Sequence, residues 1–250
     1  MNAQRPELQV AVAAPAGARI AVEGGADSVE LCTALELGGL TPSPALLDAT
    51  VATGAQVHVL IRPRPGDFIF AAEDVAVMAA DAGEALRRGA HGVVIGALSA
   101  EGRVDLAATR AVIAAAREAA PGAVLTFHRA IDHVAEPWRE LPALAELGID
   151  RVLSSGGASR AIDGVATLGR LAGAPHPVTV IAGGGVRPED IGPLQRAGVS
   201  GVHLSAKRRS GPAGGHWIPL GAGVASAAED THFVTDLDLV RAASAAVQSG

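Results

Sequence analysis

A short phrase that begins with glycine recurs four times along the chain, and it constrains the fold more than any other feature. The copies read GADSV from Gly25, GAHGV from Gly89, GIDRV from Gly148 and GVSGV from Gly198. Each follows a helix-like segment and leads into an apolar run, as expected where a glycine caps a helix and the chain turns into a strand. The spacing of about 50 to 64 residues leaves room for two strand–helix units between successive copies.

Strand candidates therefore alternate with helical segments along the whole chain. Four follow the repeated glycines and four lie between them; the set is Leu8–Ala14, Val29–Cys32, Val57–Ile61, Val93–Leu98, Val124–His128, Val152–Ser155, Val178–Ala182 and Val202–Ser205. Eight such units close into a barrel, and a chain of 250 residues is long enough for one. An open doubly wound sheet is the alternative. The regular repeat and the lack of a Gly-x-Gly-x-x-Gly turn after the first strand count against it.

We predict an α/β fold of the (β/α)₈ TIM-barrel type, with residues 1–250 forming a single domain. One helix is clear from spacing alone, because Val75, Met78, Ala82 and Leu86 share a face before Gly89. Residues 208–230 are Gly-rich and are expected to form an irregular excursion before a last helix near 236–248.

Composition narrows the class of partner. The formal charge is −6 and aromatic residues make up only 2% of the chain, which disfavours a nucleic-acid surface and base stacking. Apolar stretches are broken before the ~18 residues that a membrane span needs. We therefore expect a small-molecule partner, with neither nucleic acid nor membrane.

Two residue types that occur once each exclude further chemistry. Cys32 is the only cysteine, so the chain cannot form an internal disulfide, which suits a reducing, cytoplasmic compartment. The first ten residues also lack the apolar core of a secretory signal. Lys207 is the only lysine, and a Schiff-base enzyme would have to use it.

Alternation along the strands predicts which side chains face the barrel interior, because residues two apart share a face. The β-branched Val57, Val59 and Ile61 suit the helix-facing side. The predicted inward set contains Glu30, Cys32, His58, Leu60, Arg62, Thr126, His128, Leu153, Ser155, His203 and Ser205. Barrel interiors are normally filled by branched aliphatic residues, and unpartnered buried polar groups cost about 1–3 kcal/mol each. So many polar groups on one surface indicate a functional site, although His58 alone could be a structural, hydrogen-bonded residue.

Two loops at the carboxyl ends of strands carry features typical of anion sites. Arg62 and Arg64 flank Pro63 in a stiff loop that ends near Asp67, and arginine forks suit carboxylate or phosphate. The alternative is a pair of surface arginines bridged to Asp67 or Glu73. Gly183, Gly184 and Gly185 follow the seventh strand, where glycine amides often contact phosphate in such barrels.

Five stretches resemble, in order, the signature segments of the CutC family of copper homeostasis proteins. They are GADSVELCTALELGGLTPS (25–43), IRPRPGDF (61–68), TFHRAID (126–132), RVLSSG (151–156) and AGGGV (182–186). The resemblance implies a (β/α)₈ barrel, a cytoplasmic location, homo-oligomers and a role in copper handling, with no reaction firmly attached. Cys32 matches the family's strand-two cysteine. The first strand lacks the cysteines of some relatives, and Gln9 stands where they place an acidic residue.

Two classes of function stay open on this sequence. As a copper-binding protein, the chain would use Cys32, His58 and His203 as ligands, but one soft sulfur predicts only weak Cu(I) binding. As an enzyme of the lyase or isomerase type, it would act on a small phosphorylated or carboxylated metabolite. Glu30 and His128 would then be the catalytic acid and base. The substrate-binding set would be Arg62, Arg64, Asp67, Ser155, Gly183, Gly184, Gly185 and Ser205.

Overall fold

The computed structural model describes residues 5–211, 214 and 231–249. Eight parallel strands pair in sequence order and β1 pairs with β8, so the sheet closes into a barrel. The strands are β1 (Glu7–Val12), β2 (Ser28–Leu31), β3 (Val57–Leu60), β4 (Gly92–Ile95), β5 (Val124–Phe127), β6 (Arg151–Ser154), β7 (Thr179–Gly183) and β8 (Gly201–Leu204). The predicted (β/α)₈ barrel is confirmed, and each predicted strand overlaps an observed one.

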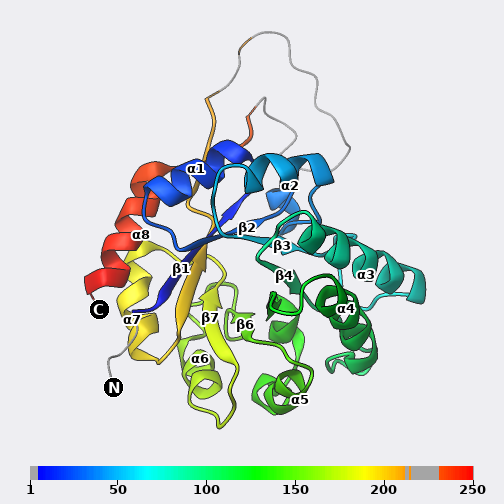
Figure 1. The fold of residues 1–250 in the computed structure, drawn as a ribbon. Coiled ribbons are helices and arrows are strands. Elements are labelled where there is room, and N and C mark those ends of the chain that lie inside the picture. Colours follow the sequence, from blue (N-terminus) through cyan, green and yellow to red (C-terminus); the bar gives the residue numbers. More distant parts are fainter. Residues whose placement is uncertain (1–4, 212–213, 215–230, 250) are drawn as a thin grey trace.

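Helices surround the strands, with one α-helix after each strand along the chain (Figure 1). They are α1 (Pro15–Glu23), α2 (Pro44–Val51), α3 (Ala72–Arg87), α4 (Leu106–Ala119), α5 (Leu141–Glu146), α6 (Val165–Ala172), α7 (Ile191–Arg196) and α8 (Leu237–Ser249). Short 3₁₀ turns lie in several connections: η1 (Leu35–Leu37), η2 (Arg129–His133), η3 (Pro137–Arg139) and η4 (Pro188–Asp190). None of the helices in the described ranges is both long and apolar enough to cross a membrane.

The repeated glycines do what the sequence pattern predicts. Gly25, Gly89, Gly148 and Gly198 adopt φ values of +93°, +94°, +84° and +92°. Each lies between a helix and the next strand, at β2, β4, β6 and β8 respectively. A residue with a Cβ would be strained in this conformation, so the repeat marks the backbone reversals that return the chain to the barrel.

The two faces of the strands form separate apolar clusters. The large cluster between strands and helices contains Val57, Val59 and Ile61, as alternation predicts. A small second cluster joins Cys32, Leu60 and Val94 inside the barrel. Cys32 and Leu60 lie at the carboxyl ends of β2 and β3, so this small cluster is at the end of the barrel where the strands finish.

A two-stranded antiparallel ribbon follows the barrel. β9 (Lys207–Arg209) pairs with β10 (Phe233–Thr235), and Lys207 Nζ lies 3.9 Å from the centre of the Phe233 ring. Arg208 and Arg209 therefore belong to a strand rather than to the irregular segment expected over 208–230, because the ladder to β10 pairs their backbone. Most of that segment lies outside the described residues.

Candidate functional site

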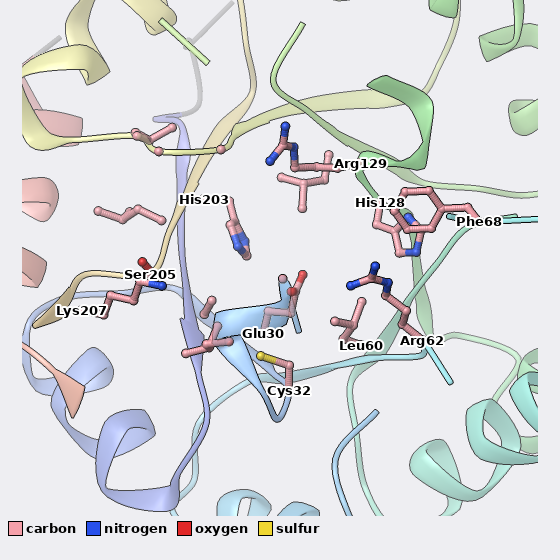
Figure 2. A pocket seen from close by; sticks show the side chains of 18 residues that line it. Glu30, Cys32, Leu60, Arg62, Phe68, His128, Arg129, His203, Ser205 and Lys207 are labelled. Carbon is pink, nitrogen blue, oxygen red and sulfur yellow. The ribbon is translucent and has the colours of Figure 1, made fainter. Parts of the chain in front are cut away.

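A cavity of about 270 Å³ opens at the carboxyl ends of the barrel strands (Figure 2). Its wall includes eight of the residues that the sequence predicts for a site, together with Leu60 and Leu153; the eight are Glu30, Cys32, Arg62, His128, Gly184, Gly185, His203 and Ser205. In the view of Figure 2, Glu30, His203, His128 and Arg62 point towards one another across the cavity. Residues that alternation predicts to face inward, from five different strands, thus line the same cavity.

Glu30 is the only acidic side chain of the described residues that lines this cavity. It is buried, and its Oε2 has no hydrogen-bond partner among the described residues. Burial raises the pKa of its carboxyl from 4.5 to about 7, because the charged form loses solvation. Glu30 can therefore gain or release a proton near neutral pH.

His128 directly follows β5 and is held in one tautomer by the backbone. The amide of Ala130 donates to its Nδ1 over 3.2 Å, so the proton of the neutral ring is on Nε2. Burial, with the nearby Arg62 charge, lowers its pKa to about 3. The Phe68 ring packs 4.9 Å from the imidazole, centre to centre. His128 is thus a neutral donor at physiological pH, and its buried Nε2 has no partner in the described part of the chain.

Arg62 lies in the cavity wall, but most of its donors are already used. Nη1 donates to the carbonyls of Leu37 and Gly39 over 2.9 and 3.1 Å, and Nη2 donates to that of Gly66 over 3.0 Å. The guanidinium thereby ties two loops to the end of β3. Its buried Nε has no partner within the described ranges, which leaves it as the donor that a ligand in the cavity could use.

Arg129 is a cavity residue that strand alternation does not predict. It follows His128 directly, so a continued strand would turn it outward; the 3₁₀ turn η2 redirects it inward instead. Its Nε donates to Asp132 over 2.8 Å and its Nη2 donates to Ser155 over 2.9 Å. The TFHRAID stretch was the available signal, since it carries both Arg129 and Asp132.

Two further residues, Ser155 and Gly184, hold Arg129 in place. Ser155 is fully buried behind the wall rather than part of it, and its hydroxyl contacts Asp132 over 2.8 Å. Gly184 has φ +112°, and a Cβ there would lie 3.0 Å from Arg129 Cζ. The glycine therefore allows the backbone after β7 to lie against the guanidinium.

The other predicted residues lie away from the cavity. His58 is buried deeper in the barrel, and burial, with the nearby Arg151 charge, lowers its pKa to about 3. Arg64 and Asp67 pair with each other at the surface over 3.0 Å, which is the structural alternative considered for that loop. Gly183 lies behind the wall, because a Cβ there would meet the side chain of Leu153.

Comparison with known proteins agrees with the fold and the signature segments. A model of the CutC family matches residues 7–208, which include every strand of the barrel. The chain belongs to the CutC family.

CutC proteins of several bacteria resemble the chain over most of its length. A family protein CutC from Caulobacter vibrioides is 42% identical over 207 residues, covering 82% of this chain and 83% of its own. One from Xylella fastidiosa is 45% identical over 204 residues, covering 80% and 74%. A solved structure from Streptococcus agalactiae, named provisionally as copper homeostasis protein CutC, gives a TM-score of 0.74. It is 25% identical and the match covers 80% of this chain and 98% of that one.

The CutC resemblance implies copper, and the described residues do not form a site that suits it. Cys32 is buried, its Sγ donates to the Val12 carbonyl over 3.8 Å, and burial together with Glu30 raises the pKa of its thiol. Cu(I) favours thiolate and thioether ligands, and Cys32 is the only sulfur in the cavity wall. No three metal-ligating side chains gather anywhere in the described ranges.

Proposed function

We propose that this CutC protein binds a small carboxylated or phosphorylated metabolite and acts on it as an isomerase, with Glu30 as the group that moves the proton. The carrying observation is the Glu30 carboxyl: it lines the cavity, has an unpartnered oxygen within the described residues, and has a pKa of about 7. A carboxyl that charges near neutral pH is suited to general acid–base catalysis.

Arg129 is the residue that we assign to the anionic group of the substrate. Asp132 and Ser155 hold its Nε and Nη2, while Nη1 takes part in neither bond. The backbone of Gly184 and Gly185 lines the same part of the cavity. A guanidinium held in one orientation binds carboxylate or phosphate with less entropy loss than a mobile one. Arg62 is less suited to this part, since its Nη atoms already contact three carbonyls.

Three unpartnered buried atoms support a reacting group on the same substrate. Glu30 Oε2 is an acceptor, whereas Arg62 Nε and His128 Nε2 are donors; none has a partner among the residues described. Unpartnered buried polar atoms are costly, so their presence on three residues of one cavity wall favours a ligand that pairs with them. A carbonyl oxygen can accept from the two donors, and a neighbouring C–H or O–H can face Glu30.

The chemistry follows from these roles. The Glu30 carboxylate takes a proton from the carbon next to a carbonyl, and the C–H electron pair shifts so that negative charge develops on the carbonyl oxygen. Arg62 Nε and His128 Nε2 stabilise that oxygen with hydrogen bonds. Where the deprotonated carbon also carries a hydroxyl, the hydroxyl proton moves to the former carbonyl oxygen and Glu30 returns its own proton to the former carbonyl carbon. The carbonyl group has then moved by one carbon, and no external reactant is needed. Neutral His128 suits this role, because its Nε2–H can donate a hydrogen bond to the oxygen while the ring stays uncharged.

Proton exchange in D₂O tests the proposal directly. The protein is incubated with small carboxylated and phosphorylated carbonyl compounds, and deuterium incorporation is followed by NMR. Exchange catalysed by the wild type should fall at least about 100-fold in Glu30→Gln, because general acid–base groups contribute 10²–10⁴-fold. Glu73→Gln, an exposed site on α3, is the matched control. Equal exchange by wild type and Glu30→Gln would refute the role of Glu30.

Anion binding is tested separately by thermal unfolding. A ligand that binds only the folded state raises the melting temperature further as its concentration rises. Phosphate and small carboxylates should stabilise the wild type and should stabilise Arg129→Ala much less. Equal stabilisation of both proteins would show that Arg129 does not bind the anion.

Copper handling is the second candidate, and the name of the Streptococcus relative is what suggests it. Cys32 in the cavity favours at most one weakly held Cu(I) ion, since no second sulfur lines the wall. A single buried thiol also suits a reducing compartment, so the proposal includes a cytoplasmic location. Self-association is proposed on the family resemblance alone, and sedimentation of the purified protein tests it.

A further inference from the structure

A line of hydrogen bonds runs through the barrel interior from Arg151 to His203. Arg151 Nη1 donates to Glu7 over 2.9 Å, and the Ser28 hydroxyl donates to the same carboxylate over 2.7 Å. Gln9 Nε2 lies 3.1 Å from Ser28 Oγ, and Gln9 Oε1 lies 2.9 Å from His203 Nδ1. The strand register explains the line, because Gln9 on β1 is the partner of both Ser28 on β2 and His203 on β8.

The direction of each bond follows from the charged end of the line. The Glu7 carboxylate can only accept, so Ser28 uses its single proton on Glu7. Ser28 Oγ must then accept from the Gln9 amide, which turns the Gln9 oxygen towards His203. An amide oxygen can only accept, and therefore His203 Nδ1 carries the proton. The ring nitrogen that remains, Nε2, has a free electron pair.

We propose that Gln9 is a positioning residue that fixes the tautomer of His203, so that Nε2 is presented to the cavity as a proton acceptor. His203 lines the cavity, whereas Gln9 is buried below it and lies outside its wall. Figure 2 shows the His203 ring projecting inward from β8 on the side of the cavity opposite Arg62. The site then combines a donor, His128 Nε2–H, with an acceptor, His203 Nε2, in neutral rings of opposite tautomer.

Gln9 is uncharged, so it brings no negative charge to balance an imidazolium at His203. Burial, with the charge of Arg129, lowers the His203 pKa to about 4. The charged or titratable groups that face the cavity with it are Glu30, Cys32, Arg62, His128, Arg129 and Lys207. Arginine and lysine among these disfavour the imidazolium, and Glu30 favours it only when ionised. A carboxylate at position 9 would act against these positive charges, because its own negative charge would favour the charged form of His203.

Nitrogen NMR of the ¹⁵N-histidine-labelled protein tests the tautomer without any substrate. Long-range proton–nitrogen correlations distinguish Nδ1–H from Nε2–H rings, and the signals missing from His203→Asn assign the residue. We expect His203 in the Nδ1–H form from pH 5.5 to 8. An Nε2–H form in the wild type would overturn the inference.

Two variants separate positioning from packing. Gln9→Glu keeps the size of the side chain and should raise the His203 pKa by about one unit or more, because an adjacent carboxylate favours the charged ring. Gln9→Met keeps the packing and removes the acceptor, so the Nδ1–H form should no longer dominate. Gln56→Met, at an exposed glutamine, is the control and should leave His203 unchanged. An unchanged His203 tautomer in Gln9→Met, or an unchanged pKa in Gln9→Glu, would refute the role of Gln9.

Ser28→Ala removes the hydrogen-bond partner of Gln9 and leaves the Gln9 side chain itself in place. It removes the group that orients the Gln9 amide and should give a mixture of His203 tautomers; an unmixed Nδ1–H form would show that Ser28 does not set the direction. The inference rests on the proposed function only in treating the cavity as a site of proton transfer. Failure of the D₂O test with the expected tautomers would refute the isomerase alone, whereas the wrong tautomer would refute this inference alone.

Discussion

The Nε of Arg129 lies 2.8 Å from the Asp132 carboxylate, and this contact holds the guanidinium at the wall of the cavity. The Asp132 side chain is 6% exposed, whereas that of Arg129 is 42% exposed. The carboxylate also accepts from the hydroxyls of Ser154 and Ser155 and from the Ser155 amide. One face of the ion pair is thus fixed inside the protein and the other is open to a ligand.

Asp132→Asn should weaken both the fold and the anion site. The asparagine keeps one acceptor but turns an NH₂ group towards donors, so we expect a loss of about 2 kcal/mol in urea unfolding. Phosphate should stabilise the variant less, because Arg129 is no longer oriented. Asp48→Asn is the control, since Asp48 pairs with Arg88 at the surface over 2.8 Å and should cost under about 0.5 kcal/mol. A similar loss in both variants would contradict the role given to Asp132.

Gly184→Ala should act through Arg129 as well as through the backbone. The positive φ of +112° is strained for alanine, and the new Cβ would lie 3.0 Å from Arg129 Cζ. We expect a destabilisation of about 2–3 kcal/mol together with weaker anion binding. Gly54→Ala is the matched control, because Gly54 has φ +82° with nothing within 4 Å of its Cβ position. It should cost only about 1 kcal/mol and leave anion binding intact; equal effects would show that the backbone alone is responsible.

Glu30 should make stability depend on pH in a direction unusual for an acidic residue. Its pKa is raised from 4.5 to about 7 on folding, so the folded protein holds the proton more tightly. The stability linked to Glu30 is therefore fully present below pH 4.5 and is lost as pH rises through 7. The loss is about 3 kcal/mol, from about 1.4 kcal/mol per pKa unit.

Glu30→Gln should remove that dependence, and denaturant unfolding from pH 5 to 8 measures it. Relative to the wild type, the variant should gain stability between pH 5 and 7.5 and then change no further. His58, His128 and His203 have lowered pKa values and destabilise both proteins as pH falls below 6.5, so their contribution cancels in the difference. A constant difference across this range would mean that the Glu30 carboxyl has an ordinary pKa.

Copper binding should be weak and should depend on pH through Cys32. The raised pKa of the buried thiol means that Cu(I) must displace a tightly held proton, so affinity should increase with pH. Competition against a Cu(I) chelator should give at most one ion per chain in the wild type and none in Cys32→Ser. Tight binding that persists in Cys32→Ser would show that other residues hold the metal.

Much of the barrel could be predicted because its signals are local. The glycine repeat requires a positive φ at Gly25, Gly89, Gly148 and Gly198, whatever the rest of the chain does. Alternation along β2 and β3 likewise assigns Glu30, Cys32 and Arg62 to the inner surface of the barrel, because successive side chains of a strand point to opposite faces.

The rest of the site depends on where the strands stop and on what the loops then do. Arg129 enters the cavity only because β5 ends at Phe127 and the 3₁₀ turn η2 begins at Arg129. Strand alternation predicts which residues share a face, but it does not predict where the strand ends. The Nη atoms of Arg62 contact carbonyls of loops 35–39 and 63–67, and backbone acceptors leave no mark in the residue types. Similarly, no local pattern pairs Gln9 with His203, because the two residues lie 194 positions apart in the sequence.

The closure of the cylinder between β1 and β8 has a consequence for how the protein is made. β1 pairs with β2 on one side and with β8 on the other, and β8 begins only at Gly201. The last helix, α8, then packs against both β1 and α1. Contacts between such distant parts of a chain form slowly, because a long loop must close before they are gained. On the ribosome, β1 must therefore wait with one edge unpaired until nearly the whole chain has emerged. An exposed strand edge is a template for association with other chains, so β1 is most prone to such association before β8 has paired with it.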